Sequence, residues 1–260
     1  MARPWTELEK EQYRSELYDL YVLQNKTMAE VAKILGIKFQ TVYDRLKRLG
    51  IATCPERKLN YQNRRSDIII PMGYSPDLAE FFGIMLGDGS LSHFQTIVTL
   101  GTKELPYVQY VANLMERLFG VSAKIAIRKR GYRDIYIGSV ELTNWLQSEG
   151  LVFNKVKAQV NVPVWIFSRK EYRERFLRGF FDTDGSVYKL RFGTQIAFIN
   201  YSLPLLRSLQ LMLKKLSYSP SAVSAHKIYL TKRPEVIRFF REIVPANEKH
   251  QKRFENFIQA

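Results

Sequence analysis

One nine-residue pattern occurs twice in this sequence, and it limits the folds open to the chain more than any other feature. The copies are Phe81–Gly89 (Phe-Phe-Gly-Ile-Met-Leu-Gly-Asp-Gly) and Leu177–Gly185 (Leu-Arg-Gly-Phe-Phe-Asp-Thr-Asp-Gly). In each copy two small residues stand four positions apart and share one face of a helix: Gly83 with Gly87, and Gly179 with Thr183. A helix face with so little side-chain bulk predicts very close contact with another backbone.

Both copies finish in an Asp-Gly pair, which predicts the end of a helix. In the second copy we expect Gly185 to supply a chain reversal, because glycine readily adopts left-handed backbone conformations. The same helix is expected to begin near Ser168, since Ser168 and Glu171 have the spacing of a capping box. Asp88 and Asp184 lie 96 positions apart, so a duplication of the chain can be tested against that offset.

The segments after the two copies follow the same order. After the first come a strand-like stretch, a helix, a hairpin and a short helix: Ser90–Leu100, Glu104–Phe119, Ala123–Arg128 with Arg133–Gly138, and Ser139–Glu149. After the second come the corresponding segments and a last helix: Gly185–Ile199, Leu203–Leu216, Ser221–Thr231, Pro234–Val244 and Glu248–Ile258. The pattern predicts a pseudo-symmetric α+β domain over residues 75–260, with αββαββα repeats at 75–163 and 164–260.

The N-terminal residues 1–51 predict a separate, all-helical domain. Apolar spacing indicates helices at about 6–24, 28–35 and 39–49, and Gly36 provides the turn between the last two. This stretch resembles the helix-turn-helix DNA-binding motif. Its outward residues are candidates for contact with DNA: Lys38, Gln40, Thr41, Arg45 and Arg48. The alternative is a helical hairpin that only packs on the main domain.

The charge of the chain predicts a polyanionic partner. Lys and Arg total 40 against 25 Asp and Glu, which gives a formal charge of +15, and this excess favours nucleic acid over a membrane surface. Residues 52–74 are interpreted as a basic linker, with Arg57, Arg64 and Arg65 available for a DNA backbone. Further candidates for DNA contact lie on or beside predicted strands: Arg128, Lys129, Arg130, Arg133, Lys189, Arg191 and Lys227.

Cysteine usage and hydropathy bear on the compartment. With Cys54 as its single cysteine, the chain forms no intramolecular disulfide and no thiolate zinc cluster, which fits a reducing compartment. There is no apolar run of 18 residues and no apolar segment at the N-terminus. We therefore expect a cytoplasmic monomer without membrane spans, located with chromosomal or organellar DNA.

The repeated helix ends, the order of elements and the charge together resemble the LAGLIDADG homing endonuclease family, in its single-chain, two-motif form. The resemblance covers about residues 75–260, and the helix-turn-helix stretch is an addition to it. Leu177–Gly185 departs from the family pattern mainly at Arg178, Phe180, Phe181 and Thr183. The first copy is looser and has Leu86 where the second has Asp182.

The resemblance implies a metal-dependent catalytic site. The two helices would pack through their glycine faces and bring Asp88 and Asp184 together, with Gly87 and Thr183 beside them as further metal ligands. Oxygen ligands favour magnesium (Mg²⁺) or Mn²⁺, and Ca²⁺ would bind without supporting cleavage. The remaining catalytic candidates are of two kinds. Lys155 and Lys249 each follow a short helix and would lie near the phosphates that are cut. Gln195, with Thr99 as a further candidate, is a polar strand residue that would position water. Asp182 is expected either to support this site or only to cap its helix.

The resemblance also implies a substrate and a binding mode. Two four-stranded sheets would form a saddle over double-stranded DNA with a long asymmetric target site, and both strands would be cut across the minor groove. Two alternatives remain open: a transcription regulator on the same scaffold that has lost catalysis, and an RNA maturase. Retention of both Asp88 and Asp184 favours the endonuclease. Because the sequence opens with Met1 and lacks a terminal His-Asn pair, excision as an intein is not expected.

Overall fold

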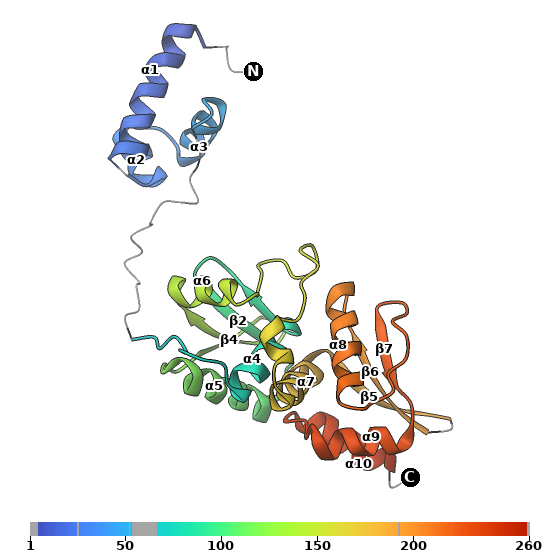
Figure 1. Cartoon of the computed structure of the whole chain (residues 1–260). Coiled ribbons are helices and arrows are strands. Elements are labelled where there is room, and N and C mark those ends of the chain that lie inside the picture. The colour runs from blue at the N-terminus through green and yellow to red at the C-terminus, as the bar shows by residue number, and fades with distance from the viewer. Residues whose placement is uncertain (1–4, 25, 52, 54–66, 192, 259–260) are drawn as a thin grey trace. The chain divides into compact units, whose positions relative to one another are not determined.

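The chain folds as two units, residues 1–62 and 63–260 (Figure 1). The computed structural model describes residues 5–24, 26–51, 53, 67–191 and 193–258. None of the helices in these ranges is both long enough and apolar enough to cross a bilayer.

The N-terminal unit is helical, as predicted. Its elements are α1 (Glu7–Tyr18) with a π-helical turn at Asp19–Leu23, α2 (Met28–Ile34) and α3 (Phe39–Arg48). Capping boxes start α1 and α2, since Thr6 and Thr27 each exchange hydrogen bonds with a glutamate three residues later. Gly36 has a φ of +62°, which lets the chain turn between α2 and α3. The small core of the unit consists of Leu17, Tyr21, Val31, Ala32, Val42, Leu46 and Ile51.

The first repeat of the second unit follows the predicted order. Its elements are α4 (Pro76–Leu86), β1 (Gly89–Leu91), β2 (Gln95–Leu100), α5 (Leu105–Phe119), β3 (Lys124–Ile127), β4 (Arg133–Gly138) and α6 (Val140–Ser148). The four strands form one antiparallel sheet in the order β1-β2-β4-β3. Ser75 caps α4 through the Leu78 N–H, and Pro76 occupies the first helical position.

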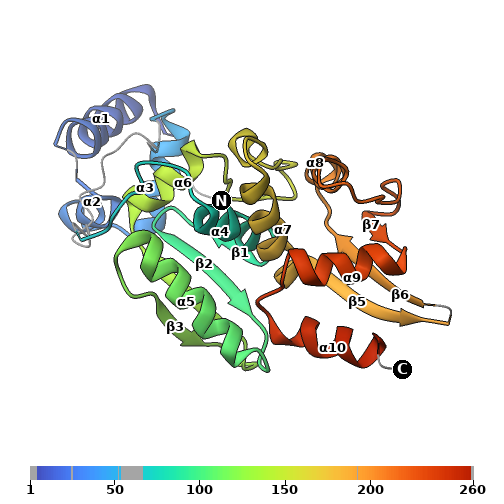
Figure 2. The ribbon, with the colours of Figure 1, turned by 60° about the horizontal axis from the view of Figure 1, so that its bottom comes forward.

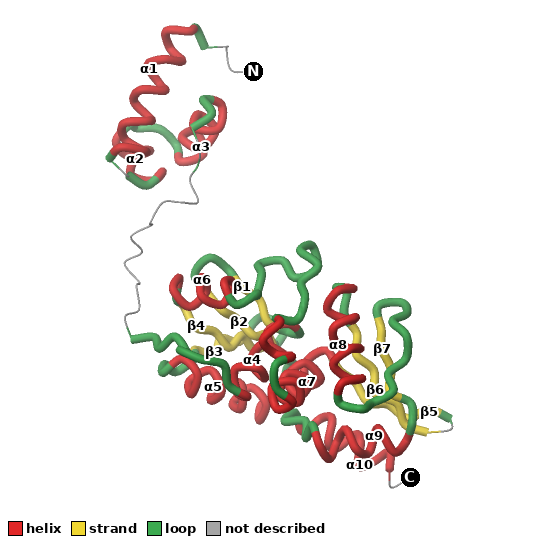
Figure 3. Tube along the Cα trace, in the orientation of Figure 1, coloured by secondary structure: helices red, strands yellow, loops and turns green. Residues whose placement is uncertain are grey.

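The second repeat departs from the prediction in its sheet. After a 3-10 turn (Val164–Phe167) come α7 (Lys170–Asp184), β5 (Gly185–Leu190), β6 (Gly193–Ile199), α8 (Leu203–Lys215), β7 (Lys227–Leu230), α9 (Arg233–Glu242) and α10 (Glu248–Ile258). Within the described residues this sheet has three strands, β5-β6-β7, where we expected four (Figure 3). Residues 225 and 226 have positive φ, and the Ser221 hydroxyl accepts the Tyr229 N–H in place of a carbonyl. The stretch before β7 therefore turns tightly and forms only isolated backbone bonds.

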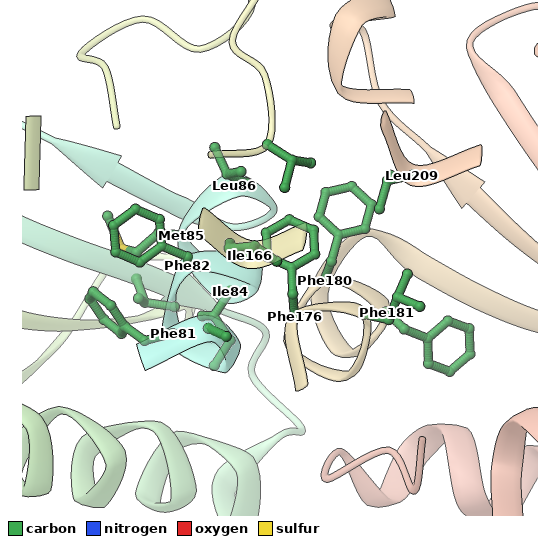
Figure 4. Close-up of a cluster of buried hydrophobic side chains, with 14 of the residues drawn as sticks. Phe81, Phe82, Ile84, Met85, Leu86, Ile166, Phe176, Phe180, Phe181 and Leu209 are labelled. Carbon is green, nitrogen blue, oxygen red and sulfur yellow. The ribbon is translucent and has the colours of Figure 1, made fainter. Parts of the chain in front are cut away.

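Helices α4 and α7 pack backbone to backbone, which confirms the contact predicted from their small residues. A Cβ placed on Gly83 would lie under 3.0 Å from the Phe176 carbonyl oxygen, and one on Gly179 would lie as close to that of Glu80. Large apolar side chains of both helices are buried around this contact (Figure 4). The shared core fixes the two helices against each other, because close-packed interiors resist displacement.

Two predictions about the ends of α7 were wrong. The helix begins at Lys170 without a side-chain cap, and the Ser168 hydroxyl instead donates to the Trp165 carbonyl of the preceding 3-10 turn. Gly185 does not reverse the chain: its φ of −90° and ψ of 160° are extended, and α7 continues directly into β5. The glycine is required for space, since a Cβ there would lie under 3.0 Å from the Phe181 carbonyl oxygen.

Candidate functional site

Two aspartates meet where α4 and α7 end. Asp88 follows α4, and Asp184 is the last residue of α7. A Cβ built on Gly87 would lie 3.5 Å from the Asp184 carboxyl carbon, so the two helix ends are in contact. Burial, together with the nearby charge of Asp88, raises the pKa of Asp184 to about 6, against a hydrogen bond from Asn200 and the charge of Lys155. Burial also raises the pKa of Asp88, with Lys249 and Lys155 opposing.

Lys155 lies at this same point and closes the end of α4. Its Nζ donates to the carbonyl oxygens of Met85 at 2.9 Å, Leu86 at 3.2 Å and Gly87. Carbonyls at a helix C-terminus lack intrahelical partners and carry partial negative charge, so an ammonium group is favourable there. Burial lowers the pKa of Lys155, and the charges of Asp184 and Asp88 oppose that shift. The lysine is thus held beside the carboxylates rather than projecting from the surface.

Lys249 occupies a different environment, although it follows the second short helix as Lys155 follows the first. Its Nζ forms an ion pair with Glu104 of the first repeat. Glu104 also accepts hydrogen bonds from the Gly101 N–H and the Asn247 amide. The pseudo-symmetry therefore breaks at the site, because one lysine caps a helix and the other is tied to a carboxylate of the opposite repeat. Sequence reasoning missed Glu104, since its partner lies 145 residues away.

Asp182 holds the chain just before Lys249. Its carboxylate accepts the N–H groups of Ala246 at 2.8 Å and Asn247 at 3.1 Å. Burial raises the pKa of Asp182 to about 7, against these two backbone hydrogen bonds. These contacts show that Asp182 bonds to the loop before Lys249 and not to its own helix, and its support of a catalytic site stays a prediction.

The polar residue next to Asp184 is Asn200, which directly follows β6, and not Gln195 within that strand. Gln195 on β6 pairs with Tyr188, four residues along β5 from Asp184, and this corresponds to about 13 Å of strand. Asn200, the first residue after β6, donates its amide to the Asp184 carboxylate at 2.8 Å. In the first repeat the Thr99 hydroxyl donates to Asp134 at 2.7 Å. The pairing of β5 with β6 places Phe198 opposite Gly185, so the end of β6 comes back to Asp184, and this register is not visible in the sequence pattern.

The oxygen-rich helix ends fit a hard divalent cation. In the described residues no group of three or more His, Cys, Asp or Glu side chains is arranged to hold a metal ion. The candidate donors are instead the two carboxylates and, as predicted ligands, Gly87 and Thr183. The Gly87 carbonyl oxygen already accepts the Lys155 ammonium group, which disfavours a metal ion at that atom. The Thr183 hydroxyl itself donates to the carbonyls of Gly179 and Phe180, each at 3.1 Å. Two partly buried carboxylates at two helix C-termini concentrate negative charge, which a cation with oxygen ligands would offset.

The predicted DNA-contact residues of the second unit, residues 63–260, which we call the main unit, fall into two groups. Arg128 forms an ion pair with Asp134, and the Arg133 guanidinium donates to the carbonyls of Thr102 and Gly131, so both have structural partners. The others lie at the surface, fully or partly exposed: Lys129, Arg130, Lys189, Arg191 and Lys227.

The N-terminal unit presents a polar helix face. On α3 and its N-terminal flank, Lys38 and Gln40 are exposed and Thr41 is partly exposed. The Arg45 guanidinium lies 4.3 Å from the centre of the Tyr13 ring, and that of Arg48 lies 4.0 Å from the Trp5 ring. Stacking of this kind holds a guanidinium in place while it keeps its charge. The predicted linker contacts Arg57, Arg64 and Arg65 lie outside the described residues.

Comparison with known proteins gives a relative that is similar in sequence and several solved structures that are similar in fold. The replication factor C small subunit of Methanocaldococcus jannaschii is 32% identical over 117 residues, which are 45% of this chain and 6% of that protein. The chain thus matches only a small part of that relative. The homing endonuclease I-DmoI, in complex with DNA and Ca, is 17% identical, with a TM-score of 0.48 over 65% of this chain and 88% of that one.

The N-terminal LAGLIDADG domain of WhiA is 18% identical to this chain, with a TM-score of 0.47 over 67% of this chain and 84% of that one. The family model described as the LAGLIDADG-like domain matches residues 171–256, which run from the first turn of α7 into α10. This chain therefore contains a LAGLIDADG-like domain over residues 171–256.

Proposed function

We propose that the unit formed by α4–α10 is a metal-dependent endonuclease that hydrolyses phosphodiesters in both strands of a specific double-stranded DNA site. The observation that carries the proposal is the meeting of Asp88 and Asp184 at two helix ends locked together by backbone contact. Lys155 lies beside both carboxylates. Clusters of partly buried carboxylates with a neighbouring cation are typical of functional sites.

The chain's own groups have distinct roles in this proposal. Asp88 and Asp184, with the backbone oxygen of Thr183, would hold the cation, while the Gly87 carbonyl oxygen stays bonded to Lys155. When bound, Mg²⁺ or Mn²⁺ supplies Lewis acidity and a more acidic water at the phosphodiester. Asn200 orients Asp184 through its hydrogen bond, and Lys155 balances the charge of the two carboxylates. Lys249 is held by its ion pair with Glu104 and by the preceding loop, whose Ala246 N–H bonds to Asp182. It offers a positive charge to the phosphate of the DNA strand that is cut.

The +15 charge of the chain supports double-stranded DNA as the partner, because phosphate contacts dominate such binding. We further propose a long, asymmetric target, a monomeric protein, and binding without cleavage in Ca²⁺. A location with cellular DNA follows from the same proposal.

A second candidate is a DNA-binding regulator without catalysis. The polar face of α3, with two arginines stacked on aromatic rings, favours a DNA-reading role for the N-terminal unit. Incubating the full chain with a randomised DNA library in Mg²⁺ or in Ca²⁺, then sequencing the ends, separates the two candidates. The endonuclease predicts defined ends with Mg²⁺ only. Binding without cut ends in either ion would favour the regulator.

Removing residues 1–50 is expected to weaken DNA binding and to shorten the protected footprint. The reason is that the exposed groups of α3 would no longer contact the duplex. Footprinting of the full and shortened chains on the selected site measures this. A footprint of unchanged length would show that the N-terminal unit does not contact DNA.

A further inference from the structure

An open hollow lies between the two repeats, beside the carboxylate site. It has a volume of about 700 Å³, within the range of about 300–1,000 Å³ that ligand pockets occupy. One wall is the Gly101–Glu104 segment and the β3–β4 turn of the first repeat. The other is the start of α10, with Lys249, His250 and Arg253. Figure 2 shows α10 beside the strand that follows α7.

The charge of this hollow is positive and mostly uncompensated. Lys103, Arg130, Lys249 and Arg253 line it, and Glu104 is the one acidic residue among the lining residues. Glu104 is already paired with Lys249. Within the described part of the chain, Lys103, Arg130 and Arg253 form no ion pair. Three exposed cations from two repeats therefore line one space, and a concentration of like charge of this kind attracts a polyanion.

His250 is a neutral, buried part of the wall of this hollow. It has no exposed surface, and its ring centre lies 4.6 Å from that of Phe181. Burial lowers the pKa of His250 to about 3, against a hydrogen bond with the Asp182 backbone. The groups that an anion can reach in the hollow are therefore the exposed cations and not this imidazole.

The corresponding position on the other side of the site carries a neutral residue that bonds to the neighbouring loop. Lys155 corresponds to Lys249, so Gln159 corresponds to Arg253, each four residues further on. The Gln159 amide donates to the Tyr201 carbonyl at 3.3 Å and accepts the Leu203 N–H at 3.2 Å. That loop corresponds to the Gly101–Glu104 segment, because each joins the second strand of its sheet to the next helix. A neutral amide bonded to protein groups therefore occupies the position where the other side has the exposed Arg253.

We propose that this hollow binds a backbone phosphate of the DNA, adjacent to but separate from the carboxylate pair, and that it does so on one side of the site only. Arg253 and Arg130 are its principal ligands, one from each repeat. The proposal rests on the proposed function, since it takes DNA as the polyanion. It adds that the two halves of the central DNA backbone are held unequally.

The test is the salt dependence of DNA binding by the full chain in Ca²⁺, with a mixed-sequence duplex as the probe. Each phosphate that a protein cation neutralises makes the slope of log K against log salt steeper by about 0.9, so the loss of one such contact makes the slope shallower by the same amount. Arg253→Gln introduces the residue type found at the corresponding position, Gln159, and is expected to make the slope shallower by about 0.9. The variant should then bind about 8-fold more weakly at about 0.1 M salt and equal the wild type near 1 M. Arg130→Gln is expected to behave alike, and the double variant to lose little more.

Arg241→Gln is the matched control, because Arg241 is an exposed arginine near the end of α9, outside the hollow. If Arg253→Gln and Arg130→Gln have the slope of the control, the phosphate pocket is wrong. The same holds if the slope changes with an RNA duplex and not with DNA. Failure of the endonuclease proposal is distinguishable, because cleavage in Mg²⁺ by the unmodified chain is scored separately. Unchanged melting temperatures of the variants, whose side chains are exposed, exclude misfolding.

Discussion

Asp184→Asn is expected to leave DNA uncut in Mg²⁺ while the variant still binds its site. The substitution removes one of two carboxylates at the meeting point of α4 and α7 and changes the side-chain volume very little. Loss of an outer partner of a metal ligand already costs about 10–100-fold in affinity or activity, so loss of the ligand itself should exceed about 100-fold. Single-turnover cleavage and a gel-shift titration in Ca²⁺ measure the two effects. Cleavage at the wild-type rate would remove Asp184 from the catalytic site.

The same substitution is expected to raise the melting temperature of the metal-free protein at neutral pH. Burial raises the folded-state pKa of Asp184 to about 6, above the ordinary range of an aspartate. The folded state therefore holds a proton that the unfolded state releases, and stability falls as the pH rises through about 6. Asparagine carries no charge, and its oxygen can still accept the Asn200 amide. The difference from wild type should shrink towards pH 4, where folded Asp184 is protonated.

Thermal melts in EDTA at pH 4 and pH 7 measure this prediction. A melting temperature equal to or below that of the wild type at pH 7 would show that burial of the Asp184 charge is not destabilising. Asn200→Ala is an informative partner variant, because it removes the hydrogen bond that favours ionised Asp184. It is expected to lower the stability at pH 7, the opposite sign from Asp184→Asn.

The parts of the fold that the sequence predicted are those written in local periodicity. Small residues four apart predicted the α4–α7 contact, and apolar spacing predicted the N-terminal helices that the structure confirms at Met28–Ile34 and Phe39–Arg48. Each of these depends on neighbours within one or two turns. The resemblance then supplied the pairing of the two aspartates, which no local pattern in one helix contains.

What the sequence did not predict depends on contacts between distant segments. The Glu104–Lys249 pair follows from how loops of the two repeats approach each other, and the Asn200–Asp184 bond follows from the pairing of β5 with β6 inside the second repeat. Ser168 has the residue spacing of a cap, yet the 3-10 turn before it takes its hydroxyl. In the stretch before β7, two residues with positive φ replaced a predicted strand. A repeat also invites symmetric assignments, and the two lysines show that side chains break that symmetry.

Gly179→Ala is expected to destabilise the main unit by at least about 3 kcal/mol, the upper end of the usual overpacking cost. In an isolated helix the change would stabilise by about 1 kcal/mol, since alanine is the better helix former. Here the new Cβ would lie under 3.0 Å from the Glu80 carbonyl oxygen. That atom is backbone and cannot rotate away, so the two helices must separate. Urea unfolding at pH 7 measures the difference, and Gly138→Ala, whose Cβ would lie 3.8 Å from the nearest atom, is the control.

Separation of the helices has a second cost, because a buried ionic cluster spans the same contact. Glu80 of α4 has no exposed surface and lies 3.2 Å from Arg175 and 3.4 Å from Arg178, both on α7. Tyr110 donates its hydroxyl to the same carboxylate at 2.5 Å. Moving α4 away leaves this charge with weaker partners, and an unpaired buried charge costs about 3–5 kcal/mol. The clash and the weakened cluster therefore act in the same direction, and Gly179→Ala should be the least stable single variant considered.

A Gly179→Ala protein as stable as the Gly138→Ala control would show that α4 and α7 are not in backbone contact. Where the variant remains folded, we expect binding in Ca²⁺ to persist and cleavage in Mg²⁺ to fall, because the distance between Asp88 and Asp184 is set by that contact.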